Sequence, residues 1–336
     1  MKIFRALAEI PADFGPTIVS VGNFDGIHCG HQHVLHEMVR RARDTGSKAA
    51  VVTFEPHPLR ILRPDAMPRL ITPLAKKEEL LAQTGLDALL EVPFTRDFSM
   101  MTAEEFARDI LASKLRAREV HEGDNFHFGH GAQGNSASLK DLGKDFGFDV
   151  HVYQVMMVRG IPVSSTQVRA LLAAGKVGMA RRLLGRNFSI TGSPGRGRGY
   201  GHKYTVPTIN LSRYDDLVPA NGVYLTRTRV DDETFNSVTN VGLRPTFGDE
   251  SFAIETHLLD FHPIDVTAQT EVEISFLKWR RPEIKFPSIE ALKAQIGEDV
   301  KRAQRYFALL AKIPATAEAR SALNGKEQVT RRHRER

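Results

Sequence analysis

The chain has 336 residues, of which 41% are hydrophobic and 26% charged, so it has the composition of a globular protein and enough length for two ordinary domains. Its formal net charge of +6 is compatible with phosphate-bearing partners, although half of that excess lies in residues 313–336. The single cysteine, Cys29, excludes an intrachain disulfide. The N-terminal residues do not resemble a signal peptide, and no apolar run is long enough to span a membrane. We therefore expect a cytoplasmic protein without a membrane partner.

Strand-like and helix-like segments alternate through the first half of the chain. Thr102 and Glu105 stand at the spacing of a capping box, which marks the start of one predicted helix. The alternation favours an α/β, Rossmann-like domain whose parallel sheet carries helices on both faces. The predicted strands are residues 17–21, 48–54, 87–92 and 149–154, and the predicted helices are residues 30–43, 74–83, 102–115 and 165–174.

The pattern changes after about residue 186. Short segments of alternating polarity follow, separated by Gly, Pro, Asn and Asp, and this spacing predicts an antiparallel β-barrel or sandwich. One amphipathic helix, residues 288–310, follows the last strand. The predicted strands are residues 187–191, 206–211, 222–230, 235–241, 252–259 and 271–277.

We therefore expect two domains, residues 1–184 and 185–312, followed by a tail, residues 313–336. The tail has six Lys and Arg residues against three Glu and lacks apolar periodicity, which is typical of a solvated, disordered segment. A nucleic-acid-binding arm is the less favoured interpretation of its charge. The sequence does not indicate an oligomeric state.

A glycine-punctuated turn follows the first predicted strand, in the sequence GNFDGIHCGH at residues 22–31. Gly22 and Gly26 allow the backbone to approach a phosphate, and the helix that follows supplies free N–H groups and a positive dipole. His28 and His31 are three residues apart, so both can face a phosphate and stabilise charge on a leaving pyrophosphate. Two alternatives remain open: an ordinary tight turn, and a metal site formed by the side chains of His28, Cys29, His31 and His33.

Three further motifs in the same half bear on this prediction. The segment IPVSSTQVR, residues 161–169, places hydroxyls and a guanidinium at another strand-to-helix junction, where they can bind phosphate oxygens. The segments TFEPHP, residues 53–58, and GDNFHFG, residues 123–129, place aromatic rings beside polar groups, as a stacked planar ligand requires. Phe126 and Phe128 are also compatible with ordinary core positions.

These motifs occur in the order seen in the bacterial bifunctional riboflavin kinase/FAD synthetase family, which the chain resembles. The resemblance continues through VPTINL, NGVY, NVGLRPTFG, IETHLLDF and FLKWRRPEIKF, and covers roughly residues 15–311. It implies that the C-terminal domain phosphorylates riboflavin to FMN with ATP, and that the N-terminal domain joins FMN to AMP from a second ATP, giving FAD and pyrophosphate. It also implies Mg²⁺ as cofactor and no permanently bound prosthetic group.

For the adenylyltransferase, the resemblance implies that His28 and His31 are catalytic and contact ATP phosphates. The ATP site it implies comprises Gly22, Phe24, Gly26, His28, His31, Asn125, Ser164, Ser165, Thr166 and Arg169. The flavin would lie near Phe54, Pro56, His57, Pro58, Phe126 and Phe128.

For the kinase, the resemblance implies that Thr208 and Asn210 are ligands of Mg²⁺ and ATP, which suits their oxygen donors. Glu255 resembles the catalytic carboxylate that accepts the proton of the attacking ribityl hydroxyl. Gly201 and Lys203 would add contacts to ATP. The flavin contacts expected in this domain are Arg244, Pro245, Thr246 and Phe247.

The chain departs from the family in one loop. Where the family usually reads RGRxLGxPTAN, this chain reads YGHKYTVPTIN at residues 200–210. Arg196, Arg198 and Lys203 could supply the missing positive charge. We expect a working kinase, because Thr208, Asn210 and Glu255 all remain. The alternatives are a weakened kinase, an FMN adenylyltransferase whose barrel only binds flavin, and an RNA-associated protein that uses the basic tail.

Overall fold

The computed structural model describes residues 1–195, 208–212, 214–246, 249–262, 264 and 266–313. The chain divides into two compact units. Unit 1 contains Met1–Phe188 and a short returning segment, Tyr214–Ala220, whereas unit 2 contains the remainder.

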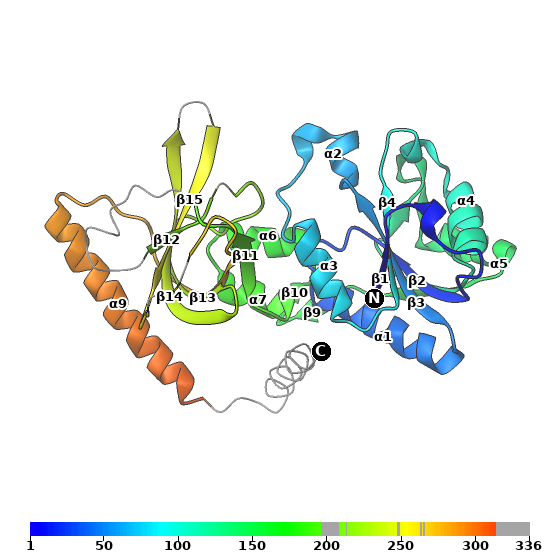
Figure 1. Cartoon of the computed structure of the whole chain (residues 1–336). Coiled ribbons are helices and arrows are strands. Elements are labelled where there is room, and N and C mark those ends of the chain that lie inside the picture. The colour runs from blue at the N-terminus through cyan, green and yellow to red at the C-terminus, as the bar shows by residue number, and fades with distance from the viewer. Residues whose placement is uncertain (196–207, 213, 247–248, 263, 265, 314–336) are drawn as a thin grey trace. The chain divides into compact units, whose positions relative to one another are not determined.

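Unit 1 is built on a six-stranded parallel sheet with the order β1-β4-β3-β2-β5-β8 (Figure 1). The order reverses at β2, because β3 and then β4 lie on one side of it and β5 and β8 lie on the other. Such a switch point opens a crevice at the carboxyl ends of the strands, where ligands of α/β proteins bind. The strands are β1 (Lys2–Phe4), β2 (Thr17–Val21), β3 (Lys48–Glu55), β4 (Ala88–Pro93), β5 (Ala117–Gly123) and β8 (Asp149–Tyr153).

Helices cover both faces of this sheet. On one face Leu35 and Met38 of α1 and Leu81 of α3 pack against apolar residues of β2, β3 and β4. On the other face Ile110 and Leu139 pack against the alternate residues of the same strands. The helices are α1 (Cys29–Thr45), α2 (Pro58–Leu62), α3 (Leu74–Ala82), α4 (Ala103–Glu105), η4 (Phe106–Lys114), α5 (Ser136–Phe146), α6 (Ser165–Ala173) and α7 (Val177–Leu184).

Small elements complete unit 1, including two hairpins, β6 (His127–Phe128) with β7 (Gly134–Asn135) and β9 (Met157–Val158) with β10 (Ile161–Pro162). The short 3₁₀ turns are η1 (Leu7–Glu9), η2 (Pro64–Ala66), η3 (Phe98–Met100) and η5 (His130–Ala132).

Unit 2 is an antiparallel sheet with the order β11-β16-β13-β14-β15-β12. A bridge between Pro194 and Leu211, next to the outermost strands, brings the two edges of the sheet together, as in a barrel. A row of buried hydroxyls joins the strands inside it; Thr239 Oγ1, for example, lies 2.8 Å from Thr256 Oγ1. The strands are β11 (Phe188–Gly192), β12 (Thr208–Asn210), β13 (Gly222–Val230), β14 (Glu233–Thr246), β15 (Asp249–Leu258) and β16 (Val272–Arg281).

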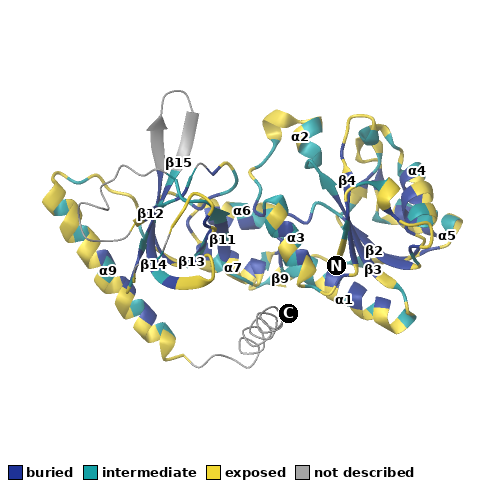
Figure 2. Cartoon of the chain, in the orientation of Figure 1, coloured by how far each residue is buried: buried dark blue, intermediate teal, exposed yellow. Residues whose placement is uncertain are grey.

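The long helix α9 (Ile289–Ala311) lies against this sheet. Ala303 and Phe307 pack on Val223, Leu225 and Val238 of β13 and β14. The rest of the helix surface is largely exposed, as the yellow faces in Figure 2 show. The predicted fold class is therefore confirmed: a Rossmann-like parallel domain, an antiparallel barrel-like sheet and a C-terminal helix.

Candidate functional sites

The loop after β2 has an unusual backbone. Phe24, Gly26 and Ile27 all have positive φ angles, of 47°, 87° and 39°. A side chain at Gly26 would be strained in that conformation and would stand 3.1 Å from Ile71, so glycine is needed there. The Gly26 N–H donates to Thr72 Oγ1 at 2.9 Å, which fixes the loop.

Asp25 organises this loop. Its buried carboxylate accepts hydrogen bonds from the backbone N–H groups of Ile71 and Thr72 at 2.9–3.1 Å and forms an ion pair with Arg169. Its backbone carbonyl accepts the hydroxyl of Ser165 at 2.7 Å. The GNFDG loop and the first turn of α6 are thereby joined, although 140 residues separate them in sequence.

His28 and His31 form a stacked pair at the start of α1. Their ring centroids are 3.6 Å apart with planes 14° from parallel, and His28 Nδ1 accepts the His31 N–H as the N-cap of the helix. Burial lowers the pKa of His28 to about 4, and burial also lowers the pKa of His31 well below its usual value. Both rings are therefore neutral at pH 7. His31 Nδ1 is buried without a hydrogen-bond partner in the described structure, so it is available to a ligand.

Acid should destabilise the protein through this pair. An unfolded histidine has a pKa near 6.5, so the unfolded chain binds more protons than the folded chain as pH falls from about 6.5 to about 4. Relative to pH 7, we expect His28 to cost roughly 2 kcal/mol of unfolding free energy at pH 5. Urea denaturation at both pH values measures this. His28→Asn keeps an N-capping side chain and should lose less stability on acidification; an equal loss in both proteins would contradict the assignment.

A cavity of about 1060 Å³ opens beside these residues in unit 1. It lies at the carboxyl ends of β2 and β5, the neighbouring strands at which the strand order reverses. The predicted residues that line it are Gly22, Phe24, His28, His31, Phe54, Pro58, Asn125, Phe126, Phe128, Ser164, Ser165 and Thr166.

Four predicted residues do not line the cavity: Gly26, Pro56, His57 and Arg169. Gly26 shapes the loop, and His57 caps α2 by accepting the Leu59 N–H. The Arg169 guanidinium is turned toward Asp25 and the carbonyl of Arg69.

Aromatic rings form part of the cavity wall. Phe54, Phe94 and Phe98 pack edge to face or tilted, with centroids 5.6–6.0 Å apart. Phe126 and Phe128 are stacked at 5.2 Å, and Phe128 also belongs to the core beneath. Such a wall suits a flat ring system.

The sequence analysis missed two residues that line this cavity, Asp25 and Glu122, and a buried lysine, Lys77, that does not line it. Glu122 lines the cavity and accepts the Val21 N–H at 2.5 Å, and complete burial raises its pKa well above the usual value. Lys77 is buried near Thr53, and burial lowers its pKa. Asp25 lies within the GNFDG motif and Glu122 directly precedes the GDNFHFG motif, so these positions could have marked both residues as members of the site. No motif marks Lys77.

The alternative of a metal site at the HxGH motif finds no support in the described structure. Among the residues that the structure describes, the one group of three potential ligands that converge is found elsewhere, and it does not include His28, Cys29, His31 or His33. The Cys29 thiol instead lies 3.5 Å from the carbonyl oxygen of Arg182, and burial raises its pKa.

Unit 2 holds the second candidate site, on β12, β15 and β14. Asn210 lies directly opposite Glu255, and Glu255 lies opposite Asn240 on the next strand. Thr208 is two residues from Asn210, so its side chain projects to the same face. The three strands thus place Thr208, Asn210, Glu255 and Asn240 in one group; only Asn240 was not predicted.

The other predicted residues of unit 2 are less fully described. Gly201, Lys203 and Phe247 lie outside the described residues, as does the variant loop at 200–205. Arg244, Pro245 and Thr246 form the end of β14, where they pair with Ser251, Glu250 and Asp249 of β15.

In the part of the chain that the structure describes, no helix has the length and apolar character needed to span a bilayer.

Comparisons with known proteins match each half of the chain to a known family. The family model described as FAD synthetase matches residues 10–167, and the model described as riboflavin kinase matches residues 184–307. A bifunctional riboflavin kinase/FMN adenylyltransferase of Pseudomonas fluorescens is 35% identical over 305 residues, which cover 90% of this chain and 97% of the relative. The protein of the same description from Escherichia coli K12 is 34% identical over 313 residues, which cover 92% of this chain and 99% of the relative.

A solved structure has a similar fold. It is a crystal structure of a Streptococcus pneumoniae protein described as a macrolide-efflux protein, with a TM-score of 0.81, 26% identity, and coverage of 90% of this chain and 98% of that one. Two family models match successive parts of the chain, and the relatives match about nine tenths of it. The chain belongs to the family of bifunctional riboflavin kinase/FMN adenylyltransferases.

Proposed function

We propose that unit 1 carries out FMN adenylylation in the cavity at the end of β2 and β5, and that unit 2 phosphorylates riboflavin beside β12 and β15. As a member of its family, the chain is an enzyme that converts riboflavin to FMN and FMN to FAD. The observation that carries the residue assignment is the convergence of His28, His31, Asn125 and the hydroxyls of residues 164–166 on one cavity.

In the adenylylation, a phosphate oxygen of FMN attacks the α-phosphorus of ATP, and the bond to the β-phosphate breaks to release pyrophosphate. No protein nucleophile is required, because positioning and electrostatic stabilisation can supply the rate. Neutral imidazoles at His28 and His31 would hydrogen-bond the phosphate oxygens. Gly30 and His31 at the start of α1 line the same cavity, so the positive dipole of the helix would add to this stabilisation.

Arg169 would have to change partner to contact a phosphate. Its guanidinium pairs with the carboxylate of Asp25 in the described structure, and Ser165 is bound to the Asp25 carbonyl. ATP phosphates would therefore compete with Asp25 for this guanidinium. We propose that Arg169 serves either as a direct ligand after that exchange or as the support that holds α6 against the loop.

The flavin would lie against the aromatic wall. Phe54 and Phe126 both line the cavity and are partly exposed, so they offer ring faces to an isoalloxazine. A cavity of about 1060 Å³ is large for a single drug-sized ligand, which suits a site that holds ATP and FMN together.

In the kinase reaction, the 5′-hydroxyl oxygen of riboflavin attacks the γ-phosphorus of ATP and ADP leaves. Glu255 would accept the hydroxyl proton as the new bond forms. Thr208 and Asn210 offer hydroxyl and amide oxygens, which are donors that fit Mg²⁺. When bound, Mg²⁺ would neutralise charge on the transferring phosphoryl group.

The flavin products of the purified protein test this function. With riboflavin, ATP and Mg²⁺, chromatography should show FMN first and then FAD, and supplied FMN should give FAD directly. FAD from FMN without any product from riboflavin would reduce the protein to an adenylyltransferase with a flavin-binding barrel. Deleting residues 313–336 is the control, because both activities should remain. Salt-sensitive RNA binding lost with the tail would favour the RNA-associated alternative.

A further inference from the structure

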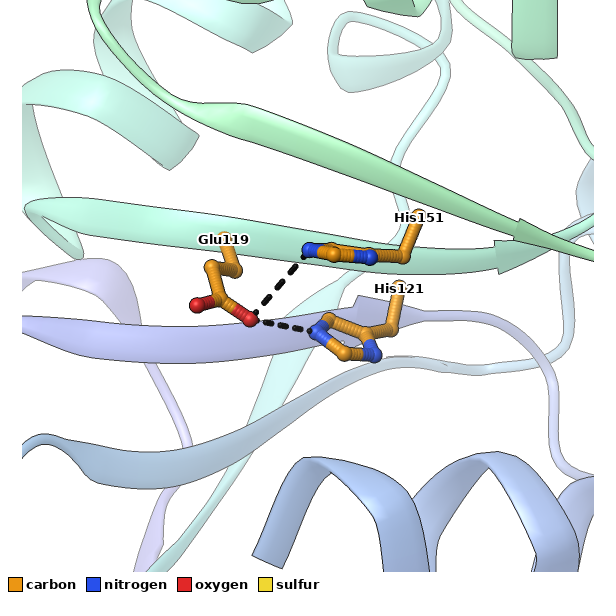
Figure 3. A group of neighbouring side chains, drawn as sticks. All are labelled: Glu119, His121 and His151. Atoms are coloured by element: carbon orange, nitrogen blue, oxygen red, sulfur yellow. Dashed lines mark hydrogen bonds and ion pairs between the residues drawn. The ribbon is translucent and has the colours of Figure 1, made fainter. Parts of the chain in front are cut away.

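Two neighbouring strands of unit 1 bring three potential metal ligands together. Glu119 and His121 are two residues apart on β5, so their side chains lie on one face of the sheet. His151 of β8 is the register partner of His121, which places it beside them (Figure 3). None of the three lines the cavity assigned to ATP and FMN.

The separations of the ligand atoms are those of a metal site. Glu119 Oε2 lies 3.0 Å from His121 Nε2 and 3.4 Å from His151 Nε2, and one atom from each residue lies within 4.8 Å of the others. Tetrahedral zinc with bonds of about 2.0–2.2 Å places neighbouring ligands about 3.3 Å apart. An ion could therefore be held with only small side-chain movements.

Outer partners already orient these ligands. His121 Nδ1 lies 2.8 Å from the Tyr153 hydroxyl, so the ring is held by the nitrogen that faces away from the cluster. Arg41 pairs with the Glu119 carboxylate and holds it in place. Metal-binding histidines and carboxylates commonly have such partners. The charge of Arg41 also opposes a dication, so we expect moderate affinity.

The ligand types favour one class of ion. Two imidazole nitrogens and one carboxylate oxygen suit zinc and similar divalent transition metals, whereas Mg²⁺ prefers oxygen ligands. Glu119 and His121 are buried, but the His151 side chain is 43% exposed, which leaves an entry path and room for a water ligand.

We propose that Glu119, His121 and His151 bind one divalent transition metal ion, represented by Zn²⁺, at a site distinct from that of the Mg²⁺ used with ATP. The ion would join β5 to β8 next to Tyr153, a residue that lines the nucleotide cavity. Without the ion, the same carboxylate is satisfied by Arg41 and His121.

Calorimetric titration of the metal-free, full-length protein with ZnCl₂, in a buffer without nucleotide, tests the proposal. The wild type should bind one Zn²⁺ at this site, and saturating Zn²⁺ should raise the melting temperature. His151→Asn should lose at least about tenfold in affinity and show a smaller shift in melting temperature at the same Zn²⁺ concentration, because it removes the exposed ligand. Excess Mg²⁺ should leave Zn²⁺ binding unchanged.

The matched control is His262→Asn in unit 2. His262 Nε2 lies 2.8 Å from Glu233 Oε2, so it is also an exposed histidine beside a glutamate, but it belongs to no three-ligand group among the residues that the structure describes. This variant should bind Zn²⁺ as the wild type does. Circular dichroism and FMN adenylylation check that His151→Asn is folded.

Three outcomes would overturn the proposal. In the first, the wild type does not bind Zn²⁺. In the second, His151→Asn binds Zn²⁺ with unchanged affinity. In the third, Zn²⁺ binding survives in His151→Asn but disappears in His31→Asn, which would place the ion at the HxGH motif.

Discussion

The His31→Ala variant should form FAD from FMN at least about a hundredfold more slowly than the wild type, while it forms FMN from riboflavin at the normal rate. His31 Nδ1 is buried with no hydrogen-bond partner among the residues that the structure describes, and the His31 ring stacks on His28, which also lines the cavity. The substitution removes the ring that we expect to face the phosphates of ATP, and it leaves unit 2 unchanged in sequence.

Two separate assays measure this effect, one starting from riboflavin and one from FMN, each with ATP and Mg²⁺. His36→Ala is the matched control, because His36 is an exposed histidine on the same helix and does not line the cavity. The melting temperature shows whether the variants are folded. Normal FAD formation by His31→Ala, or loss of both activities in a folded variant, would refute the assignment of His31 to the adenylylation site.

Glu255→Gln should have the opposite effect. Glutamine is close in size to glutamate but cannot accept the proton of the attacking hydroxyl, so FMN formation should fall by about a hundredfold to ten-thousandfold. FAD formation from supplied FMN should continue. Glu255 pairs with Asn210 of β12 and Asn240 of β14, and an uncharged side chain should leave that strand register intact.

Chromatography of the flavin products measures the two rates, in one reaction that starts from riboflavin and one that starts from FMN. Glu233→Gln is the control, since Glu233 is an exposed glutamate at the start of β14 whose Oε2 lies 2.8 Å from His262 Nε2. If Glu255→Gln phosphorylates riboflavin normally, another group must accept the proton. If the folded variant loses FAD formation as well, the two reactions do not have separate sites.

The sequence was sufficient to predict those elements whose structure depends on residues close together in the chain. The predicted strand at residues 17–21 has the bounds observed for β2, because its β-branched run is a local signal. The capping box of Thr102 and Glu105 is present, as their spacing predicts. In unit 2, the alternation of polar and apolar residues locates the strands, although β14 continues well beyond the predicted end.

For other elements of unit 1, the local sequence was not sufficient to predict the structure. The sequence did not predict strand β5, helix α5 or helix α7, and the helix after Thr102 proves to be π-helical over Phe106–Lys114. Leu115 donates to the carbonyl of Ile110, five residues before it. The spacing of apolar residues alone does not distinguish a π-helix from an α-helix, because both kinds of helix bury one face.

For the sites, the motifs predict which residue types would contact each ligand, and the family resemblance that they carry implies the two reactions. Tertiary structure alone decided how those residues meet. Asp25 reaches Arg169 across 144 residues, and His151 lies beside His121 only because β8 pairs with β5 in one register. Strand order and register depend on contacts between distant segments, and a shift of one residue would turn each side chain to the opposite face. That is why the sequence alone could predict a chemistry for the first site but could not reveal the cluster of Glu119, His121 and His151.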